Sequence, residues 1–538
     1  NGVDAALTVD GAGAGSITAH DDPAGGVLFT TDGTLTIKGA GAQTIATRFG
    51  GGAGLGAIEL HSNIGTNNVV FSKIVGATGG NAIKSLTIDN GVAATAATSV
   101  DLQETANILT INLGTSNLKL SNAGNYKIDS IVPKINGTAN LLISADGTTL
   151  VAQDTNAGAN LGSEEVKLQA LVFTANHTLN IGDGVNVYAN NVLNASQTLA
   201  NAISPAGGTI SHGKLIFAGN SIFDATMTAT DKVNTITGPG AGKEAKIMRE
   251  AHTNAAIIIG AGTLSFGSSV NANGNILAAV DAAGTLKFIN TADALVTGEV
   301  GAAGATRVKT IEFNGTGKVA FGAKVHAGVT DFKFTKDTAT TVTFDATTLV
   351  GAFAVESGTG AASTIVATNA AGDVDFTKSV TGTNGVIYKL NTAGLVVAKI
   401  TPAAAGDLAL ASFTTGTAGT NTVDFRTADA TVKSIGEFGK NMQAVIFTTS
   451  GRVTGGTYSE TITINDDQTG TFGGPVGVGA GDFVVGSGAN GGTAAFADGF
   501  VLERAITTSL GGKSTVNFAG GATINKDITG TGFAAVNF

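Results

Sequence analysis

Two short acidic segments carry residue types that could bind a metal ion. One is His20-Asp21-Asp22 and the other is Asn465-Asp466-Asp467. Hard cations such as Ca²⁺ prefer clustered carboxylate and carbonyl oxygens, and both segments are expected to be turns. The candidate calcium ligands are therefore Asp21, Asp22, Asp466 and Asp467. A plain solvated turn is the alternative interpretation at each place.

A glycine-rich segment at 237–244 resembles a phosphate-binding loop only superficially. Thr237 stands where the motif needs its first glycine, and Glu244 stands where it needs a metal-binding serine or threonine. A glutamate there would repel phosphate, so we interpret the segment as an exposed turn. The histidines lie far apart, without a second histidine or cysteine at zinc-ligand spacing: His20, His61, His177, His212, His252 and His326.

The sequence contains few residues suited to sugar binding, nucleophilic catalysis or nucleic-acid binding. With no Trp and 4 Tyr, the chain has little to build a sugar-stacking platform, and we find neither a nucleophile elbow nor a credible Ser-His-Asp order. We therefore expect no enzyme. The 40 acidic residues outnumber 30 basic ones, which would repel a polyanion, so we expect no nucleic-acid partner.

Composition instead indicates a packed, weakly charged body. The chain of 538 residues is 43% hydrophobic and 13% charged, against about 25% charged in ordinary globular domains. Disordered chains need low hydrophobicity and high net charge, so this chain can bury a core. Its core residues are Val, Ile, Leu and 26 Phe, which favour strands, and its 78 Gly favour turns between them.

The strand pattern repeats. An apolar-polar-apolar cassette recurs as Leu86-Thr87-Ile88, Leu286-Lys287-Phe288 and Val423-Asp424-Phe425, and the chain ends on Val536-Asn537-Phe538. Successive inner Phe residues are separated by about twenty to twenty-five residues, which suits one coil of a β-solenoid. We therefore predict an all-β solenoid with the Phe side chains stacked inside. Tandem β-sandwich domains are the alternative, although no clear linkers divide the chain.

Two stretches have helical spacing, namely 189–203 and 242–253. The predicted organisation is a repetitive β region over 1–238, a helical insertion over 239–254, and a second repetitive β region over 255–538.

Several features favour export. The chain has no Cys, begins with Asn1 instead of Met, and has no run of about 18 apolar residues that could form a membrane-spanning helix. We expect a processed segment of an extracellular protein.

The repeat pattern of the sequence resembles that of a known protein family. The phrases His177-Thr178-Leu179-Asn180-Ile181-Gly182-Asp183-Gly184 and Gly284-Thr285-Leu286-Lys287-Phe288 are similar to the Ala-, Gly-, Asn- and Thr-rich passenger region of rickettsial outer membrane protein B-like surface autotransporters. This resemblance implies a secreted passenger that is cleaved from a C-terminal barrel, stays on the outer membrane as a surface layer, and contributes to adhesion. This resemblance assigns no functional residue, because it concerns the pattern of the repeats and not a catalytic motif.

The expected function is therefore a structural surface-layer or autotransporter passenger subunit at the bacterial cell surface. Its expected partners are further copies of itself in a lattice or filament, and the outer membrane or its barrel anchor. An adhesin that binds a host receptor or glycan is one alternative, and a polysaccharide-acting solenoid enzyme is another. No cofactor other than calcium is expected.

Overall fold

The structure is a computed structural model of the chain. It describes residues 6–11, 15–18, 26–29, 31–39, 42–51, 54–60, 69–76, 82–88, 99–153, 158–194, 212–267, 271–302, 306–326, 331–334, 341–344, 354–357, 362–367, 374–383, 385–390, 396–477, 481–486, 489–502, 505–508, 513–525, 527–530 and 533–538. The chain forms two compact units, unit 1 (1–279) and unit 2 (280–538).

All regular elements in the described residues are β-strands, and their side chains alternate between core and surface. In β27 (Ala283–Phe288), Leu286 and Phe288 are buried, whereas Thr285 and Lys287 between them are half-exposed. Successive side chains on a strand point to opposite faces, so the apolar-polar cassette places its apolar residues inside. The predicted all-β class is confirmed.

Strands pair in parallel with strands one coil away. β27 pairs with β29 (Val308–Phe313), which places Phe288 beside Phe313, and β29 pairs with β31 (Asp331–Phe334), which places Phe313 beside Phe334. These partners are 25 and 21 residues apart (313 − 288 and 334 − 313), within the predicted coil length. The chain is therefore a parallel β-solenoid. The tandem-sandwich alternative is wrong, because sandwiches are built from antiparallel strands.

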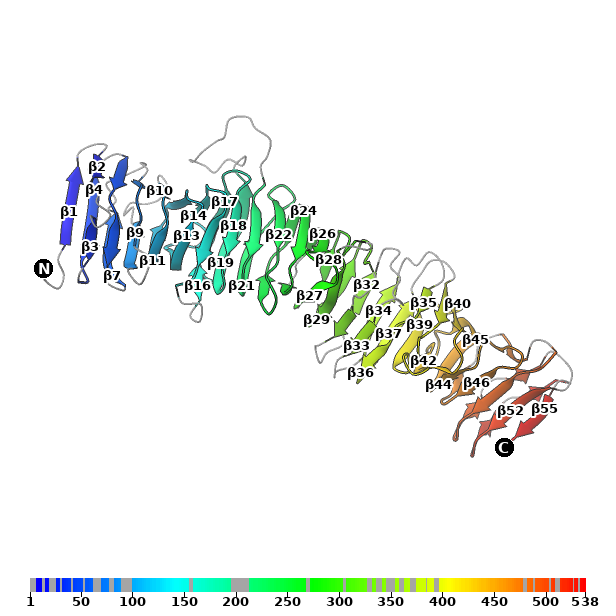
Figure 1. Cartoon of the computed structure of the whole chain (residues 1–538). Helices are drawn as coiled ribbons and strands as arrows, with labels where there is room; N and C mark the ends of the chain where they lie inside the picture. Colours follow the sequence, from blue (N-terminus) through cyan, green and yellow to red (C-terminus); the bar gives the residue numbers. More distant parts are fainter. Residues whose placement is uncertain are drawn as a thin grey trace. The chain divides into compact units, whose positions relative to one another are not determined.

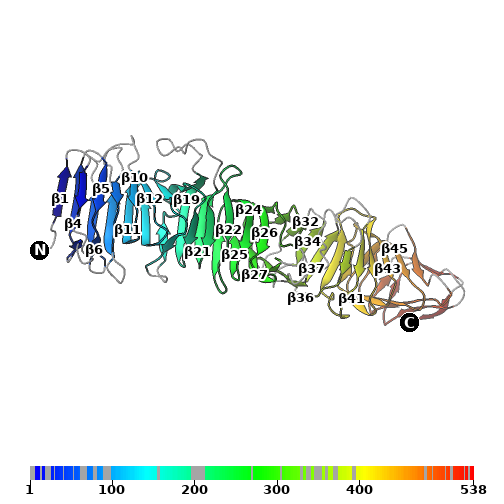
Figure 2. The same cartoon turned by 45° about the horizontal axis from the view of Figure 1, so that its top comes forward.

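Unit 1 shows the same stacking. β9 (Ile83–Ile88), β11 (Ala106–Gly114) and β13 (Asn125–Pro133) lie side by side in chain order (Figure 1). Leu86 pairs with Ile111, and Ile111 pairs with Ile131. Figure 2 shows the strands of unit 1 from a second direction. Each coil therefore extends the sheet of the coil before it, and the apolar residues form continuous rows inside.

The predicted inner phenylalanines form these rows in unit 2. The rings of Phe288 and Phe313 stack with centroids 5.8 Å apart and planes 9° from parallel. The terminal Phe538 stacks on Phe518 at 5.3 Å, as the last cassette predicts, although 79% of Phe538 is exposed. Phe376, Phe425 and Phe447 of unit 2 are also buried. The side chains of Phe334 and Phe344 lie outside the described residues.

The predicted helices are not present where the structure describes the chain. Within 242–253 it contains β23 (Glu244–Ile247) and the start of β24 (Ala251–Ile259). Residues 189–194 belong to β19 (Val185–Asn194), and 195–203 lie outside the described residues. Ile247 pairs with Phe223 on one side and Phe266 on the other. These ladder partners override the local helical spacing, because a strand between two strands satisfies its backbone hydrogen bonds on both edges.

Two Asp-Gly pairs, at 146–147 and 183–184, form turns. Gly147 and Gly184 have φ of 82° and 75°, the left-handed region that glycine reaches without a steric penalty. Within the described part of the chain, no helix is long and apolar enough to cross a bilayer.

Candidate functional site

The second acidic segment forms a turn after β45 (Thr457–Ile464). Asp467 has a φ of 59°, and Asp466 Oδ2 accepts a hydrogen bond from the Asn490 backbone N–H at 3.1 Å. Asp467 Oδ2 accepts a second one from Asn490 Nδ2 at 2.8 Å. Asp21 and Asp22 lie outside the described residues. Among the residues that the structure does describe, no three His, Cys, Asp or Glu side chains group around a common metal position. The calcium site at Asp466 and Asp467 stays a prediction.

The glycine-rich segment is a turn between β22 (Val233–Thr237) and β23. Lys243 Nζ lies 2.5 Å from Asp183 Oδ2, two coils away, and this hydrogen bond holds the pKa of Asp183 below its usual value. Glu244 Oε1 accepts a hydrogen bond from Ser265 Oγ at 2.5 Å. The lysine that would contact a phosphate is thus paired with a carboxylate, in agreement with the interpretation as a turn.

A charged cluster lies on three coils of unit 1. Asp224, 8% exposed in β21 (Ser221–Thr226), accepts hydrogen bonds from Lys167 Nζ at 2.5 Å and from Arg249 Nε at 2.7 Å. Burial by itself would raise the pKa of Asp224, but the hydrogen bonds from the two cations outweigh it and lower the pKa. A carboxylate held ionised in this way joins coils and is unsuited to act as a general acid.

The described histidines have separate surroundings. His252 Nε2 lies 3.4 Å from Glu250 Oε2 and 3.1 Å from Asn273 Nδ2. His326 Nε2 lies 3.3 Å from Glu299 Oε2. These contacts agree with the expectation that the histidines are structural or solvated. His20 and His61 lie outside the described residues.

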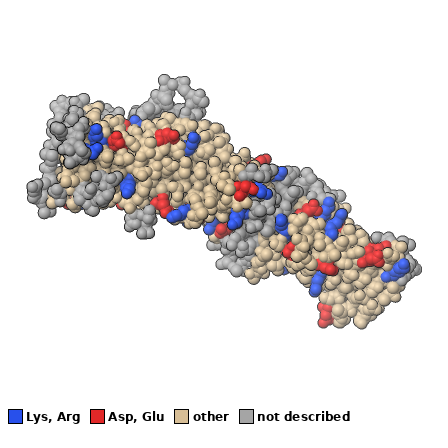
Figure 3. All heavy atoms as spheres, viewed as in Figure 1, with Lys and Arg blue, Asp and Glu red and all other residues tan. Residues whose placement is uncertain are grey.

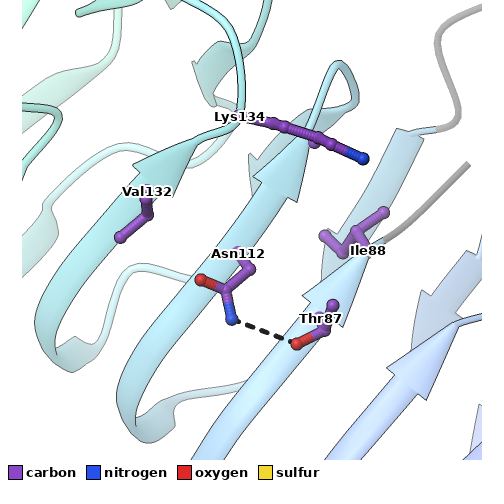
Figure 4. Close-up of a pocket in the computed structure, with 6 residues that line it drawn as sticks. Thr87, Ile88, Asn112, Val132 and Lys134 are labelled. Carbon is purple, nitrogen blue, oxygen red and sulfur yellow. Dashed lines mark hydrogen bonds between the residues drawn. The ribbon is translucent and has the colours of Figure 1, made fainter. Parts of the chain in front are cut away.

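A surface pocket lies across three coils of unit 1, and sequence analysis did not identify it. We call it the Val132 pocket. Its cavity is about 280 Å³, and it is lined by Thr87, Ile88, Asn112, Gly114, Val132 and Lys134. Figure 4 shows these side chains on the ends of β9, β11 and β13, where Asn112 Nδ2 donates to Thr87 Oγ1 at 3.1 Å.

The pocket arises from an irregularity in the ladder between β11 and β13. The register shifts between Asn112 and Gly114, and Gly114 has a φ of 62°. Bulges of this kind locally disrupt pairing, and a glycine there places no side chain between neighbouring coils. One lining residue, Val132, is an exposed apolar side chain, 41% exposed. The lining therefore combines the apolar Ile88 and Val132 with the polar Thr87, Asn112 and Lys134.

An exposed aromatic residue projects from unit 2. Phe438 is 90% exposed and lies at the tip of a tight turn, which we call the Phe438 turn and which comprises residues 437–440. Its ring meets Tyr458 of β45 edge to face, with centroids 6.3 Å apart. The apolar periodicity did not reveal this residue, because Phe438 belongs to no alternating cassette.

Charges on the described surface are dispersed. On the face seen in Figure 3, Lys, Arg, Asp and Glu occur singly or in small opposite-sign groups among other residues. Some described charges form ion pairs between coils, as Lys287 and Glu312 do at 3.4 Å on adjacent coils.

The fold and the surface together define a class of protein, a parallel β-solenoid with a weakly charged exterior. Among its described residues, no three His, Cys, Asp or Glu side chains lie close enough together to bind a metal ion. Within that class the chain is a distant homologue of the outer membrane protein B of Rickettsia. It is 27% identical to outer membrane protein B of Rickettsia rickettsii over 373 residues, which are 60% of this chain and 21% of that protein. The proteins of the same name from Rickettsia conorii and Rickettsia prowazekii are 28% and 26% identical over 41% and 56% of this chain, and 14% and 20% of their own lengths.

The matched segments thus span about a fifth or less of these relatives. No family model matches the chain, and no solved structure does. The relatives are named as outer membrane proteins, in agreement with the extracellular, cell-surface location that the composition favours.

Proposed function

We propose that this chain is a structural subunit of a bacterial surface coat, part of a surface-layer or autotransporter passenger that self-associates over the outer membrane. The observation that carries the proposal is the combination of a parallel β-solenoid with homology to proteins named as outer membrane proteins. A solenoid presents a long, repetitive face in which every coil offers a similar set of outward side chains.

The charge of the chain favours close packing of copies. A net charge of −10 over 538 residues is a low density, and strong net charge is what keeps proteins apart in solution. Some of the described charges are also neutralised within the molecule. Lys243 pairs with Asp183, and Arg307 Nη2 lies 2.5 Å from Asp281 Oδ2.

The same pairs support a non-enzymatic role. A glycosidase needs one carboxylic acid whose pKa is raised, so that it can protonate the leaving group. The pKa values of Asp183, Asp224 and Asp281 are lowered, because each accepts hydrogen bonds from cationic side chains or backbone N–H groups. These carboxylates brace the coils.

Sedimentation velocity and electron microscopy of the purified 538-residue chain over a range of concentrations test the proposal. We expect assembly to increase with concentration and to yield ordered sheets or filaments. A chain that remains monomeric at every concentration contradicts it.

An adhesin that binds a host receptor or glycan is the second candidate, and the exposed Phe438 favours it. Exposed aromatic side chains are common anchors in binding interfaces. Saturable binding of the monomer to host cells, without formation of arrays, would support the adhesin.

A further inference from the structure

A polar cluster on two neighbouring strands of unit 1 combines a histidine with a carboxylate and two carboxamides. β24 and β26 (Ala272–Ala278) pair in parallel, with Ala251 beside Ala272 and His252 beside Asn273 (Figure 1). Ala251 and Ala272 are buried, so the side chains on either side of them point outward. These partly exposed side chains are Glu250, His252, Asn271 and Asn273. We propose that Glu250, His252 and Asn273 bind a Zn²⁺ ion that joins the two coils.

A bulge in the ladder positions these side chains. The register shifts between His252 and Ala256, so residues 253–255 stand opposite Gly274 alone. Gly274 has a φ of 137°, and a Cβ there would lie 2.1 Å from Thr253 Oγ1, so this arrangement requires glycine. Bulges interrupt backbone pairing, re-aim side chains and are common beside functional sites. An ion bound here would join the coils at the point where their ladder is interrupted.

The proposed ligand atoms are spaced as they are around a metal ion. His252 Nε2 lies 3.4 Å from Glu250 Oε2 and 3.1 Å from the side-chain amide of Asn273. Two ligand atoms that each lie about 2.1 Å from a zinc ion are about 3.0–3.4 Å from each other at tetrahedral or octahedral angles. Both spacings therefore fit a shared ion.

The two contacts of His252 Nε2 require opposite roles of that atom. The ionised Glu250 carboxylate only accepts hydrogen bonds, whereas Asn273 Nδ2 only donates them. One ring nitrogen cannot donate to the first and accept from the second at the same time. With the His252 proton on Nδ1, a half-turn of the Asn273 amide leaves three lone pairs facing one another. A cation at their centre satisfies all three.

The surroundings of the cluster orient the carboxylate and leave room for an ion to enter. Asn271 Nδ2 donates to Glu250 Oε1 at 3.0 Å, and outer contacts of this kind orient metal ligands. The neighbouring Arg249 is paired with Asp224, its Nε lying 2.7 Å from Asp224 Oδ1. The side chains of Glu250 and His252 are 42% and 17% exposed, so the ion keeps a water molecule as its fourth ligand.

The ligand set selects zinc over calcium. An imidazole nitrogen together with carboxylate and amide oxygens suits Zn²⁺, whereas Ca²⁺ takes six to eight oxygen ligands. The cluster contains only two side chains of the types that bind metal ions most often, Glu250 and His252. The carboxamide of Asn273 supplies the third ligand, which is why histidine spacing in the sequence did not indicate this site.

Isothermal titration calorimetry of Zn²⁺ into the metal-free 538-residue chain measures the binding. His252→Ala and Glu250→Gln should each weaken it on the order of 100-fold, and Asn271→Ala, which removes an outer contact, about 10-fold. Asn273→Asp should bind zinc more tightly than the wild type, because a carboxylate is a stronger ligand than a carboxamide.

His212→Ala is the matched control. His212 Nδ1 lies 3.3 Å from Asn194 Nδ2, and no carboxylate is hydrogen-bonded to it within the described chain. We expect this variant to bind zinc like the wild type. Circular dichroism verifies that every variant is folded.

Hydrogen exchange followed by mass spectrometry locates the ion. Zinc should slow exchange in β24 and β26 of the wild type, because a ligand that binds only the folded state opposes local opening. Exchange in these strands should not respond to zinc in His252→Ala, nor to Ca²⁺ in the wild type.

The outcomes decide the proposal separately from self-association, which sedimentation measures. The zinc site is wrong if the wild type binds no Zn²⁺, or if His252→Ala and Glu250→Gln bind it as tightly as the wild type. Protection confined to other strands also overturns it. An Asn273→Asp variant that binds no more tightly than the wild type contradicts the three-ligand site.

Discussion

Phe425 and Phe447 are partners on adjacent coils, and their buried rings stack with centroids 4.6 Å apart and planes 6° from parallel. The centroid distance is close to the spacing of neighbouring strands, about 4.7–4.9 Å, so these two rings follow the backbone ladder from one coil to the next. A single cassette residue therefore contributes both to its own coil and to the next one.

Replacing Phe447 with Ala should open a cavity between these coils. We expect the local opening free energy of β40 (Thr420–Phe425) and β43 (Met442–Phe447) to fall by about 3–5 kcal/mol, the usual loss for a buried phenylalanine. Hydrogen exchange followed by mass spectrometry measures it. Because coils interact mainly with their neighbours, exchange in unit 1 should not change. Phe538→Ala, at a residue that is 79% exposed, should have little effect.

Asp224→Asn should destabilise unit 1 in a pH-dependent way. The change leaves Lys167 buried without its anion and should cost about 2–3 kcal/mol at pH 7, less than for a fully buried pair because Arg249 is half-exposed. The folded pKa of Asp224 is lowered, so its contribution is complete above the unfolded pKa of about 3.9 and disappears as pH falls through the folded pKa. Urea denaturation should show a smaller difference from the wild type at pH 3 than at pH 7. An equal difference at both pH values would contradict the assignment.

Arg307→Met should raise the pKa of Asp281. That pKa is lowered to about 2, first by the side-chain hydrogen bond from Arg307 and then by the Arg307 backbone N–H, which donates to Asp281 Oδ1 at 2.9 Å. The backbone donor remains in the variant, so the pKa should stay below the ordinary value of about 3.9. NMR titration of ¹³C-labelled aspartate carboxyls measures the change, and an unaltered pKa would show that the guanidinium has no such effect.

Gly385→Ala should be more costly than Gly242→Ala. Both glycines have φ near the left-handed region, at 76° and 74°, where alanine is disfavoured by about 1–2 kcal/mol. A Cβ at Gly385 would also lie 2.1 Å from the Leu410 carbonyl oxygen, whereas nothing lies within 4 Å of one at Gly242. We expect losses in the free energy of unfolding of about 3 kcal/mol and about 1 kcal/mol respectively. Equal losses in urea denaturation would mean that the contact with Leu410 relaxes.

The calcium proposal at Asp466 and Asp467 is tested by removing the ion. We expect EDTA to lower the thermal unfolding temperature of the chain and added Ca²⁺ to restore it, because a ligand that binds only the folded state stabilises it. The double variant Asp466→Asn, Asp467→Asn should not respond. A wild-type chain that is insensitive to EDTA rules out a stabilising calcium ion.

The amino-acid sequence by itself determined the strands and the inward Phe residues. These follow from alternation over a few residues, as in β52 (Ser514–Phe518), where Ser514, Val516 and Phe518 are buried and the intervening residues are not. Alternation is a local property, so it can be predicted without knowing which coils are neighbours. The same local argument failed at 242–253, where helical spacing and strand partners disagreed.

Only the tertiary structure decided which residues meet across coils. Lys167 and Asp224 are 57 residues apart, and the coil offset ranges from 17 residues between Phe447 and Ile464 (464 − 447) to 36 between Val187 and Phe223 (223 − 187). Because insertions change the offset from coil to coil, neighbours on the surface cannot be counted from the sequence. The Val132 pocket also depends on which coils are neighbours. Its lining comes from three coils, and it lies beside a register shift at Gly114 that no local pattern encodes.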